Sequence, residues 1–266
     1  LTLAPWIQPM SEQLLINLNP NNVIMSANVS DTLLIYYNHC LDQIIMETSI
    51  YYGNENKKGM FDDIEEPTDK ELEDQLKVNV ARNLRSSPGR RVWRSGFLKS
   101  GVSKFNRVVE RHVSSYGAYW KSYDFDSNRG RKNIFQNPLD FDHAGGEIIF
   151  NLPNGLQAYL LVDKNGNRID EGPVSIVFTT IGNDPIIRNG LSCMSCHTKG
   201  MKEFNDRSSE LRAAIQNTVF DDERDKVYAL ALYSESEKMS ELVEADKETY
   251  ERAIEELNAV VGGKEP

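Results

Sequence analysis

Short apolar runs separated by turn-forming residues fill the middle of the chain and predict an antiparallel sheet. These runs are rich in aromatic and β-branched residues, which favour strands, and they lie at 116–125, 147–152, 156–162 and 174–180. Glycine-containing turn signals follow two of them, at 153–155 and 165–166. We therefore expect a β-rich region over 86–190, which begins near the break at Pro88-Gly89.

After residue 197 the apolar residues recur at helical spacing, so we expect the segment 191–266 to be helical. Asn205 or Asp206 can cap a first helix and Asp221 a second, while Ser234 and Glu237 form a capping box for a third. The third helix has an apolar stripe that ends before Gly262-Gly263: Met239, Leu242, Val243, Tyr250, Ala253, Ile254 and Leu257. With residues 1–85 as a mixed or helical N-terminal region, the predicted fold class is α+β.

The charge is unevenly distributed, which limits the partners that we expect. The net charge is −10, but residues 82–135 contain 13 Lys and Arg against 3 Asp and Glu. This basic segment suits acidic groups of a ligand, an acidic protein partner or the acidic flanks of the chain itself. Nucleic acid is not an expected partner, because an acidic molecule repels phosphate. No apolar run reaches about eighteen residues, so we expect no transmembrane segment, and the start at Leu1 suggests a processed chain.

The most specific signal is the run Cys193-Met194-Ser195-Cys196-His197, which has the Cys-x-x-Cys-His spacing of covalent haem attachment. Residues i, i+3 and i+4 share one face of a helical turn. Cys193 and Cys196 can therefore reach the two vinyl groups of one porphyrin while His197 ligates the iron. We expect one covalent haem c. Because this attachment takes place outside the bacterial plasma membrane, we expect a periplasmic or extracellular protein, in which the remaining thiol, Cys40, would be buried.

Two other uses of the cysteines are open at this point. His39 and Cys40 could complete a zinc site with Cys193 and Cys196, since structural zinc takes four Cys or His ligands. A thioredoxin-like dithiol is the second alternative, although no βαβ pattern precedes Cys193. The segment 163–167 resembles the start of a calcium loop, but it lacks the glycine and glutamate that an EF-hand needs further on. We expect a hairpin turn there.

The group opposite His197 decides between an electron carrier and a catalyst. His143 is the favoured sixth iron ligand, because the small residues beside it allow the backbone to approach a bulky group. Met239 is a second candidate, but its place in the apolar stripe favours a core role. His112 is a third candidate, or else a surface histidine paired with a carboxylate. Met201 is excluded because it follows His197 by one helical turn and stays on the same side of the ring.

The stretch 100–201 resembles a family of large, poorly characterised c-type cytochromes of planctomycetes and similar bacteria. The resemblance rests on SGVS at 100–103, NRVVERH at 106–112, GAYWKSYDF at 117–125, HxGGEIIF at 143–150, LPNGLQ at 152–157 and CMSCH at 193–197. It implies an exported protein with one haem on Cys193, Cys196 and His197, and it adds weight to His112 and His143 as distal residues. More distantly, the chain is similar to the β-sheet cytochromes of the c-prime-beta type, in which a five-coordinate haem lies beside a sheet.

These observations predict an exported mono-haem c-type cytochrome that passes single electrons to a redox partner protein, with His143 as the sixth ligand. One alternative is a haem enzyme of the peroxidase or small-oxidant type, in which Arg111 or His112 lies over an open iron and polarises a bound peroxide. A second alternative is a haem-bearing sensor or interaction module within a larger exported assembly.

Overall fold

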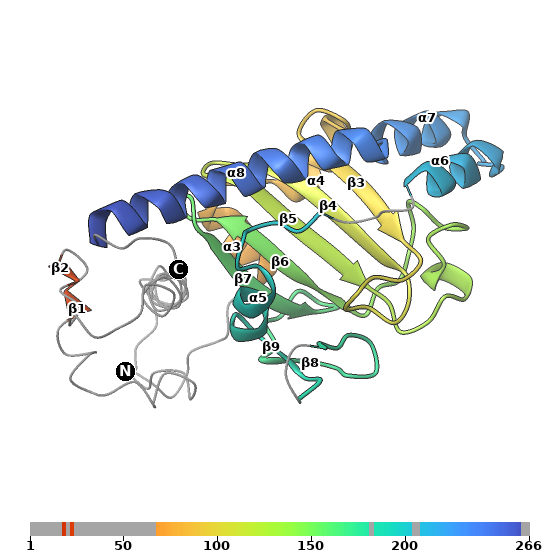
Figure 1. Cartoon of the computed structure of the whole chain (residues 1–266). Helices are drawn as coiled ribbons and strands as arrows, with labels where there is room; N and C mark the ends of the chain where they lie inside the picture. Colours follow the sequence, from red (N-terminus) through yellow and green to blue (C-terminus); the bar gives the residue numbers. More distant parts are fainter. Residues whose placement is uncertain (1–17, 20–21, 24–67, 181–183, 204–207, 262–266) are drawn as a thin grey trace, which may run out of the picture.

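The computed structural model describes residues 18–19, 22–23, 68–180, 184–203 and 208–261 of the 266-residue chain (Figure 1). Its centre is one antiparallel sheet with five strands in chain order: β3 (Val92–Phe97), β4 (Arg107–Ser114), β5 (Gly117–Asp124), β6 (Gly145–Asn151) and β7 (Gln157–Asp163). Two short pairs are separate from it: β1 (Leu18–Asn19) with β2 (Asn22–Val23), and β8 (Glu171–Gly172) with β9 (Ile187–Arg188). Each strand of the main sheet therefore pairs with its neighbours in the sequence.

The expected α+β class is confirmed, and three of the four expected strands are present. The segments 116–125, 147–152 and 156–162 correspond to β5, β6 and β7. The expected strand at 174–180 is wrong, because Pro173 starts a turn in which its carbonyl accepts hydrogen bonds from the amides of Ile176 and Val177. Within that segment, Val177 forms an isolated bridge with Ser103.

Strands β3 and β4 do not follow from the hydrophobic pattern, because charged residues interrupt it. Arg94 lies in β3, and Arg107, Glu110 and Arg111 lie in β4. All four side chains are largely buried in ion pairs, and β3 is buried along its whole length. Part of the basic segment therefore forms the edge strand and the second strand of the sheet.

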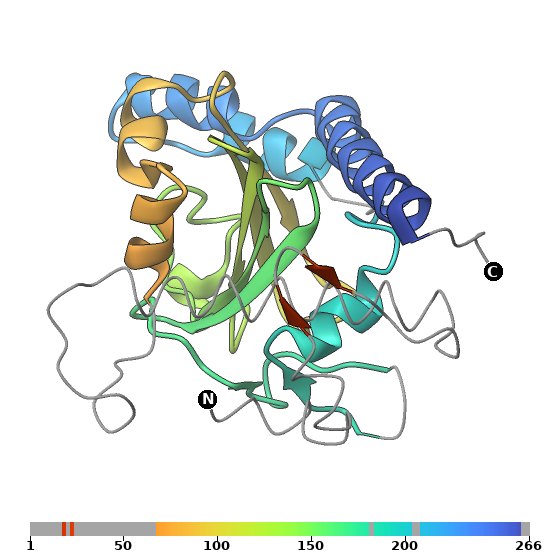
Figure 2. The same cartoon turned by 90° about the vertical axis from the view of Figure 1, so that its left-hand side faces the viewer.

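Helices cover both faces of the sheet (Figure 2). α3 (Asp69–Gln75) and α4 (Val80–Ser86) cover one face, and α5 (Leu191–Cys196) and α8 (Ser236–Val261) cover the other. α6 (Ser208–Asn217) and α7 (Glu223–Leu232) lie beside β3, and a 3₁₀ turn (Gly130–Lys132) lies between β5 and β6. We call the two sides the α4 face and the α8 face. Along β5, Tyr119, Lys121 and Tyr123 point to the α4 face, whereas Trp120 and Ser122 point to the α8 face.

Residues from all three expected regions share the same cores. On the α4 face, Leu72 of α3 packs in one cluster with Tyr119 of β5. On the α8 face, Met239 of α8 packs in one cluster with Trp120 of β5 and Cys193 of α5. Burial of a large apolar side chain contributes roughly 1.5–3 kcal/mol, so these contacts hold the helices on the sheet.

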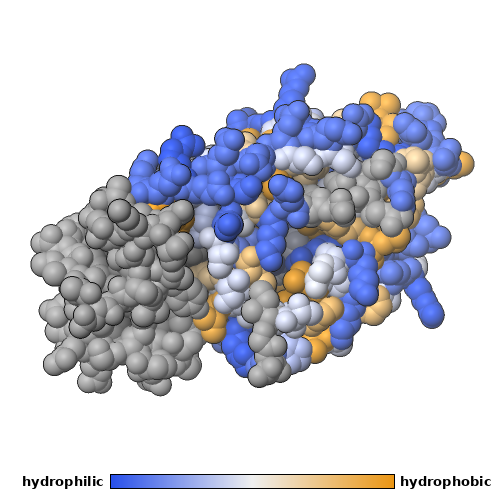
Figure 3. All heavy atoms as spheres, viewed as in Figure 1, coloured by the Kyte–Doolittle hydropathy of each residue, from blue (hydrophilic) through white to orange (hydrophobic). Residues whose placement is uncertain are grey.

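The C-terminal part is helical, as expected. α7 begins after Asp222, whose side chain accepts a hydrogen bond from the Arg224 amide, one residue later than the predicted cap. The apolar stripe of α8 is buried at Met239, Val243, Tyr250 and Ala253. Its outer surface is mainly hydrophilic (Figure 3). The predicted caps Asn205 and Asp206, the stop at Gly262-Gly263 and most of residues 1–67 lie outside the described residues. In the described ranges no helix has the length and hydropathy needed to cross a membrane.

The turn after β7 is the expected hairpin. Val162 forms an antiparallel bridge with Arg168 across it. The Asp163 carboxylate accepts hydrogen bonds from the amides of Asn165 and Asn167 at 2.7 and 2.9 Å, which is turn chemistry rather than cation binding. Gly166 has a φ of 83°, the conformation for which glycine is favoured.

Gly145 and Gly146 approach neighbouring strands rather than a cofactor. A Cβ atom on Gly146 would overlap the carbonyl oxygen of Ser122 in β5, and one on Gly145 would lie 2.6 Å from the carbonyl oxygen of Val162 in β7. The sheet itself therefore requires these glycines, and they give no support to His143 as an iron ligand.

Candidate functional site

Helix α5 carries both cysteines of the Cys-x-x-Cys-His run, and His197 caps its C-terminus. The hydroxyl of Ser192 accepts a hydrogen bond from the Arg188 amide at 2.9 Å, which ties the first turn of α5 to β9. Cys193 is buried and Cys196 is half-buried, and both are free thiols. The helical spacing directs both thiols and the imidazole to one side of α5.

The imidazole of His197 has one ring nitrogen fixed by the backbone. Nδ1 lies 3.1 Å from the carbonyl oxygen of Gly200, to which it can donate a hydrogen bond. Gly200 has a φ of 78°, and its own amide bonds back to the His197 carbonyl at 3.0 Å. The ring lies near Tyr159, with 5.9 Å between centroids. Burial lowers the pKa of His197, which favours the neutral imidazole that ligates metals, and Nε2 is left for that role.

A cavity of about 500 Å³ lies between α5 and the α8 face of the sheet. Cys193, Cys196 and His197 all line it. Strands β3 to β6 supply an apolar wall of four side chains, which are Phe97, Val109, Trp120 and Ile149. Small-molecule and cofactor pockets measure roughly 300–1,000 Å³, so this cavity has the size of a cofactor site.

One part of the cavity lining is charged. Arg107 and Glu147 line the cavity together with Ser122. The Arg107 guanidinium lies 3.2 Å from Ser122 Oγ, 3.1 Å from Asp124 Oδ2 and 3.6 Å from Glu147 Oε2. Burial and the neighbouring Glu147 carboxylate raise the pKa of the Cys193 thiol. We call Arg107, Asp124 and Glu147 the cavity charge cluster.

His143 lies on the other side of the sheet from this cavity. Its ring packs edge-on against Tyr123, with 5.1 Å between centroids, and lies 6.5 Å from the ring of Phe141. Tyr123 points to the α4 face, so the sheet separates His143 from His197. Successive positions on a strand face opposite sides, so Tyr123 lies on the α4 face while its neighbour Ser122 lines the cavity. The expected role of His143 as the sixth iron ligand is therefore wrong.

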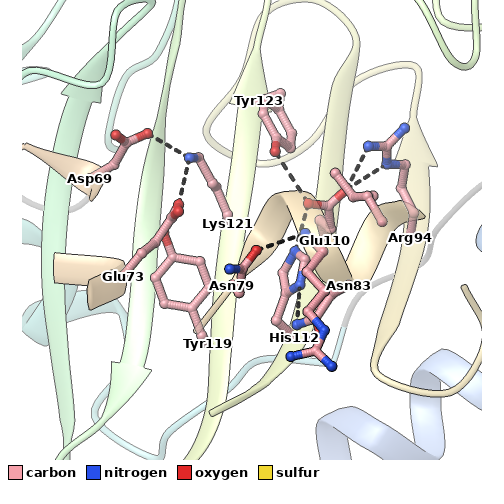
Figure 4. A network of polar contacts seen from close by, with 12 residues as sticks. Asp69, Glu73, Asn79, Asn83, Arg94, Glu110, His112, Tyr119, Lys121 and Tyr123 are labelled. Atoms are coloured by element: carbon pink, nitrogen blue, oxygen red, sulfur yellow. Dashed lines mark hydrogen bonds and ion pairs between the residues drawn. The ribbon is translucent and has the colours of Figure 1, made fainter. Parts of the chain in front are cut away.

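His112 and Arg111 do not line the cavity either, contrary to their expected distal roles. His112 is fully buried on the α4 face, where its Nε2 lies 2.7 Å from Glu110 Oε1 and its Nδ1 lies 3.2 Å from the Asn83 amide (Figure 4). Both ring nitrogens therefore have partners. Arg111 points to the α8 face, but its guanidinium makes two hydrogen bonds of 2.7 Å to Asp246 of α8.

The candidate Met239 lies outside the cavity lining, whereas Met201, which the sequence argument excluded, lies in it. Met239 is buried in the α8-face core and does not line the cavity. α5 ends at Cys196, and a turn rather than a helix runs from His197 to Gly200. The helical argument that excluded Met201 as a ligand is therefore wrong. Among the described residues that line the cavity, His197 is the only histidine.

Only part of the signal for the cavity charge cluster is present in the sequence. Arg107 and Glu147 each stand two positions before an apolar residue that also lines the cavity, Val109 and Ile149, which is the alternation of a strand face. Arg107 and Glu147 come together only when β4, β5 and β6 pair. The strand β4 is not predicted, because its charged residues interrupt the hydrophobic pattern.

The residues present fit a covalently bound haem. Two free thiols and an oriented neutral imidazole line one cavity with an apolar wall. Among the described residues no three His, Cys, Asp or Glu side chains converge on a possible metal position, and His39 and Cys40 lie outside those residues. Comparison of the chain with known protein families, with curated proteins and with solved structures finds no match. The candidate site therefore rests on the geometry of this chain.

Proposed function

We propose that this chain is an exported c-type cytochrome with one covalent haem, anchored by thioether bonds to Cys193 and Cys196 and ligated by His197. The observation that supports this most is that the three side chains line one cofactor-sized cavity, with Nδ1 of His197 directed to Gly200 and Nε2 available. Covalent attachment outside the plasma membrane implies a periplasmic or extracellular location. Membership of the planctomycete-type cytochromes is part of the same proposal.

Bound haem would supply one-electron chemistry at its iron. The Gly200 carbonyl orients the His197 imidazole and makes it a better ligand. The apolar side chains of the wall, Trp120 among them, give that part of the cavity a surface that disfavours water. Lys99 and Lys202, which line the cavity and are exposed, offer charge partners for the carboxylates of a cofactor or of an acidic redox partner.

The geometry favours an open sixth position over the carrier in which His143 ligates the iron. His143 and His112 lie across the sheet, and Met239 is in the core. An iron with a free position would bind small ligands, so a haem protein that binds a small ligand is favoured over a six-coordinate carrier, without the distal roles expected of Arg111 and His112. A redox partner protein would then supply or remove single electrons.

Covalent attachment is the decisive test. When the chain is produced with a haem-attachment system and exported, we expect haem to migrate with it on a denaturing gel and to add one haem mass. The double variant Cys193→Ala/Cys196→Ala should lose that haem, whereas the control Cys40→Ala should keep it. A wild-type chain that carries no covalent haem would overturn the proposal.

The sixth position is tested on the same material by the ferric absorption spectrum. We expect a high-spin spectrum that changes on addition of cyanide. A low-spin spectrum that cyanide leaves unchanged would contradict the open position and restore the six-coordinate carrier.

A further inference from the structure

The cavity charge cluster holds two carboxylates and one guanidinium. The side chains of Arg107, Asp124 and Glu147 are 11 %, 5 % and 16 % exposed. When both carboxylates are ionised, the cluster carries one more negative charge than positive charge, beside the residues that would hold the haem. Buried charge of one sign is costly, and protonation of a carboxylate would remove that excess charge.

Asp124 is the member of the cluster best placed to accept that proton. It does not line the cavity and lies behind Arg107. Its Oδ1 is 3.0 Å from Arg107 Nε, yet neither of these two buried atoms makes a hydrogen bond within the described part of the chain. The groups that face Asp124 are Arg107 from β4, Glu147 from β6 and the hydroxyl of Ser103 from the β3–β4 loop. Burial raises the pKa of Asp124, with Glu147 acting in the same direction and Arg107 and Ser103 against it.

A change of charge in the cavity must act on this carboxyl group. One electron added to a haem held by Cys193, Cys196 and His197 would add one negative charge to the cavity that Arg107 and Glu147 line. A like charge in a buried site disfavours the ionised carboxylate and raises its pKa. By linkage, protonation of the carboxylate favours reduction to the same extent.

We propose that Asp124 takes up one proton from solvent when a one-electron donor reduces the haem site, so that electron transfer and proton transfer are coupled in this protein. The inference rests on the proposed function. The electron goes to the iron, which changes from ferric to ferrous, and the donor is oxidised by one electron. The proton forms an O–H bond on the Asp124 carboxylate, and reoxidation releases it.

The other face of the sheet supplies a matched control. Lys121 lies 2.6 Å from Asp69 and 3.2 Å from Glu73, so this cluster also has two carboxylates and one cation. It faces α3 and does not line the cavity. Asp69→Asn therefore removes a carboxylate from a cluster of the same composition without touching the candidate site.

The experiment is a spectroelectrochemical titration of the full chain with its covalent haem, between about pH 5 and pH 8. In the wild type we expect the midpoint potential to fall as pH rises. Within the interval between the Asp124 pKa values of the two redox states, the equilibrium constant for reduction should fall about tenfold per pH unit. Asp124→Asn should remove this dependence and raise the potential at the high-pH end, whereas Asp69→Asn should keep the wild-type dependence.

A second measurement needs no variant. The infrared difference between reduced and oxidised wild-type protein should contain a gained carboxylic-acid C=O band. A potential that does not vary with pH, a dependence that survives in Asp124→Asn, or the absence of that band would overturn the inference. Failure of covalent haem attachment is a different result, because it would overturn the proposed function itself.

Discussion

The two faces of the central sheet bury charge in different ways. On the α4 face, Glu110 accepts hydrogen bonds from Arg94 at 2.5 and 2.8 Å, and its other oxygen lies 2.7 Å from His112 and 3.2 Å from Tyr123 (Figure 4). On the α8 face, the cavity charge cluster borders a space of about 500 Å³. The first arrangement is closed and holds the fold together, whereas the second is open to a ligand.

Adjacent positions on single strands separate these two roles. Glu110 and Arg111 are neighbours in β4, yet Glu110 belongs to the α4-face network and Arg111 binds Asp246 of α8. In β5 the neighbours Lys121 and Ser122 divide in the same way. The alternation of the strand thus places neighbouring residues, about 3.3 Å apart along the chain, on opposite sides of the sheet.

Removal of the central carboxylate from the closed network should have the largest effect on stability. Glu110→Gln leaves the buried Arg94 without its counter-charge, and we expect a loss of about 3–5 kcal/mol in the free energy of unfolding. Urea unfolding measures this loss. The control Asp140→Asn breaks an exposed pair with Arg131 and should change stability far less. Equal losses in the two variants would show that the α4-face network is no more important than a surface pair.

The same network should govern acid unfolding. Burial alone would raise the pKa of Glu110, but Arg94 and His112 bring it down from 4.5 to about 2. Because the folded pKa lies below the unfolded value, the stabilisation is complete above about pH 4.5 and is lost as pH falls towards 2, with a total of about 3 kcal/mol. The stability gap between wild type and Glu110→Gln should therefore narrow as urea unfolding is repeated from pH 6 downwards. A constant gap would contradict the lowered pKa.

The contrast between the faces also explains which features could be predicted from the sequence. The grouping of Cys193, Cys196 and His197 could be predicted because these residues lie within about one turn of each other in the sequence. The strands β5, β6 and β7 could be predicted because apolar side chains dominate them. β3 and β4 could not, since their buried arginines and Glu110 resemble an exposed segment until the ion partners are known.

The predictions of the distal residues were wrong for a related reason. The choice of His143 required knowledge of the face to which it belongs, which depends on the pairing of β5 with β6 rather than on nearby residues. Arg107 and Glu147 come together only across three strands. Sheet register, a long-range property, therefore decides which charges reach the cavity.

On the α8 face, the counterpart of Glu110 is Asp246. Its carboxylate accepts two hydrogen bonds from Arg111 at 2.7 Å and one from Trp120 Nε1 at 2.8 Å. Asp246→Asn keeps the shape but loses the charge, and we expect a loss of about 1–3 kcal/mol in unfolding free energy. Because Trp120 lines the cavity, the haem absorption spectrum should shift as well, whereas Glu110→Gln should leave it unchanged. A shift of equal size in both variants would remove the functional distinction between the faces.

The variant His143→Ala should have the smallest effect on stability, and it tests most directly whether the two faces of the sheet are separate. His143→Ala removes edge-to-face ring contacts with Tyr123 and Phe141, which contribute about 0.5–1.5 kcal/mol, so thermal unfolding should shift by only a few degrees. The ferric haem spectrum should not change, because the sheet lies between this ring and His197. If His143→Ala instead converted a low-spin spectrum into a high-spin one, His143 would have to reach the iron. The two faces would then not be separate, since a ligand on the α4 face can reach the cavity only if β5 and β6 part.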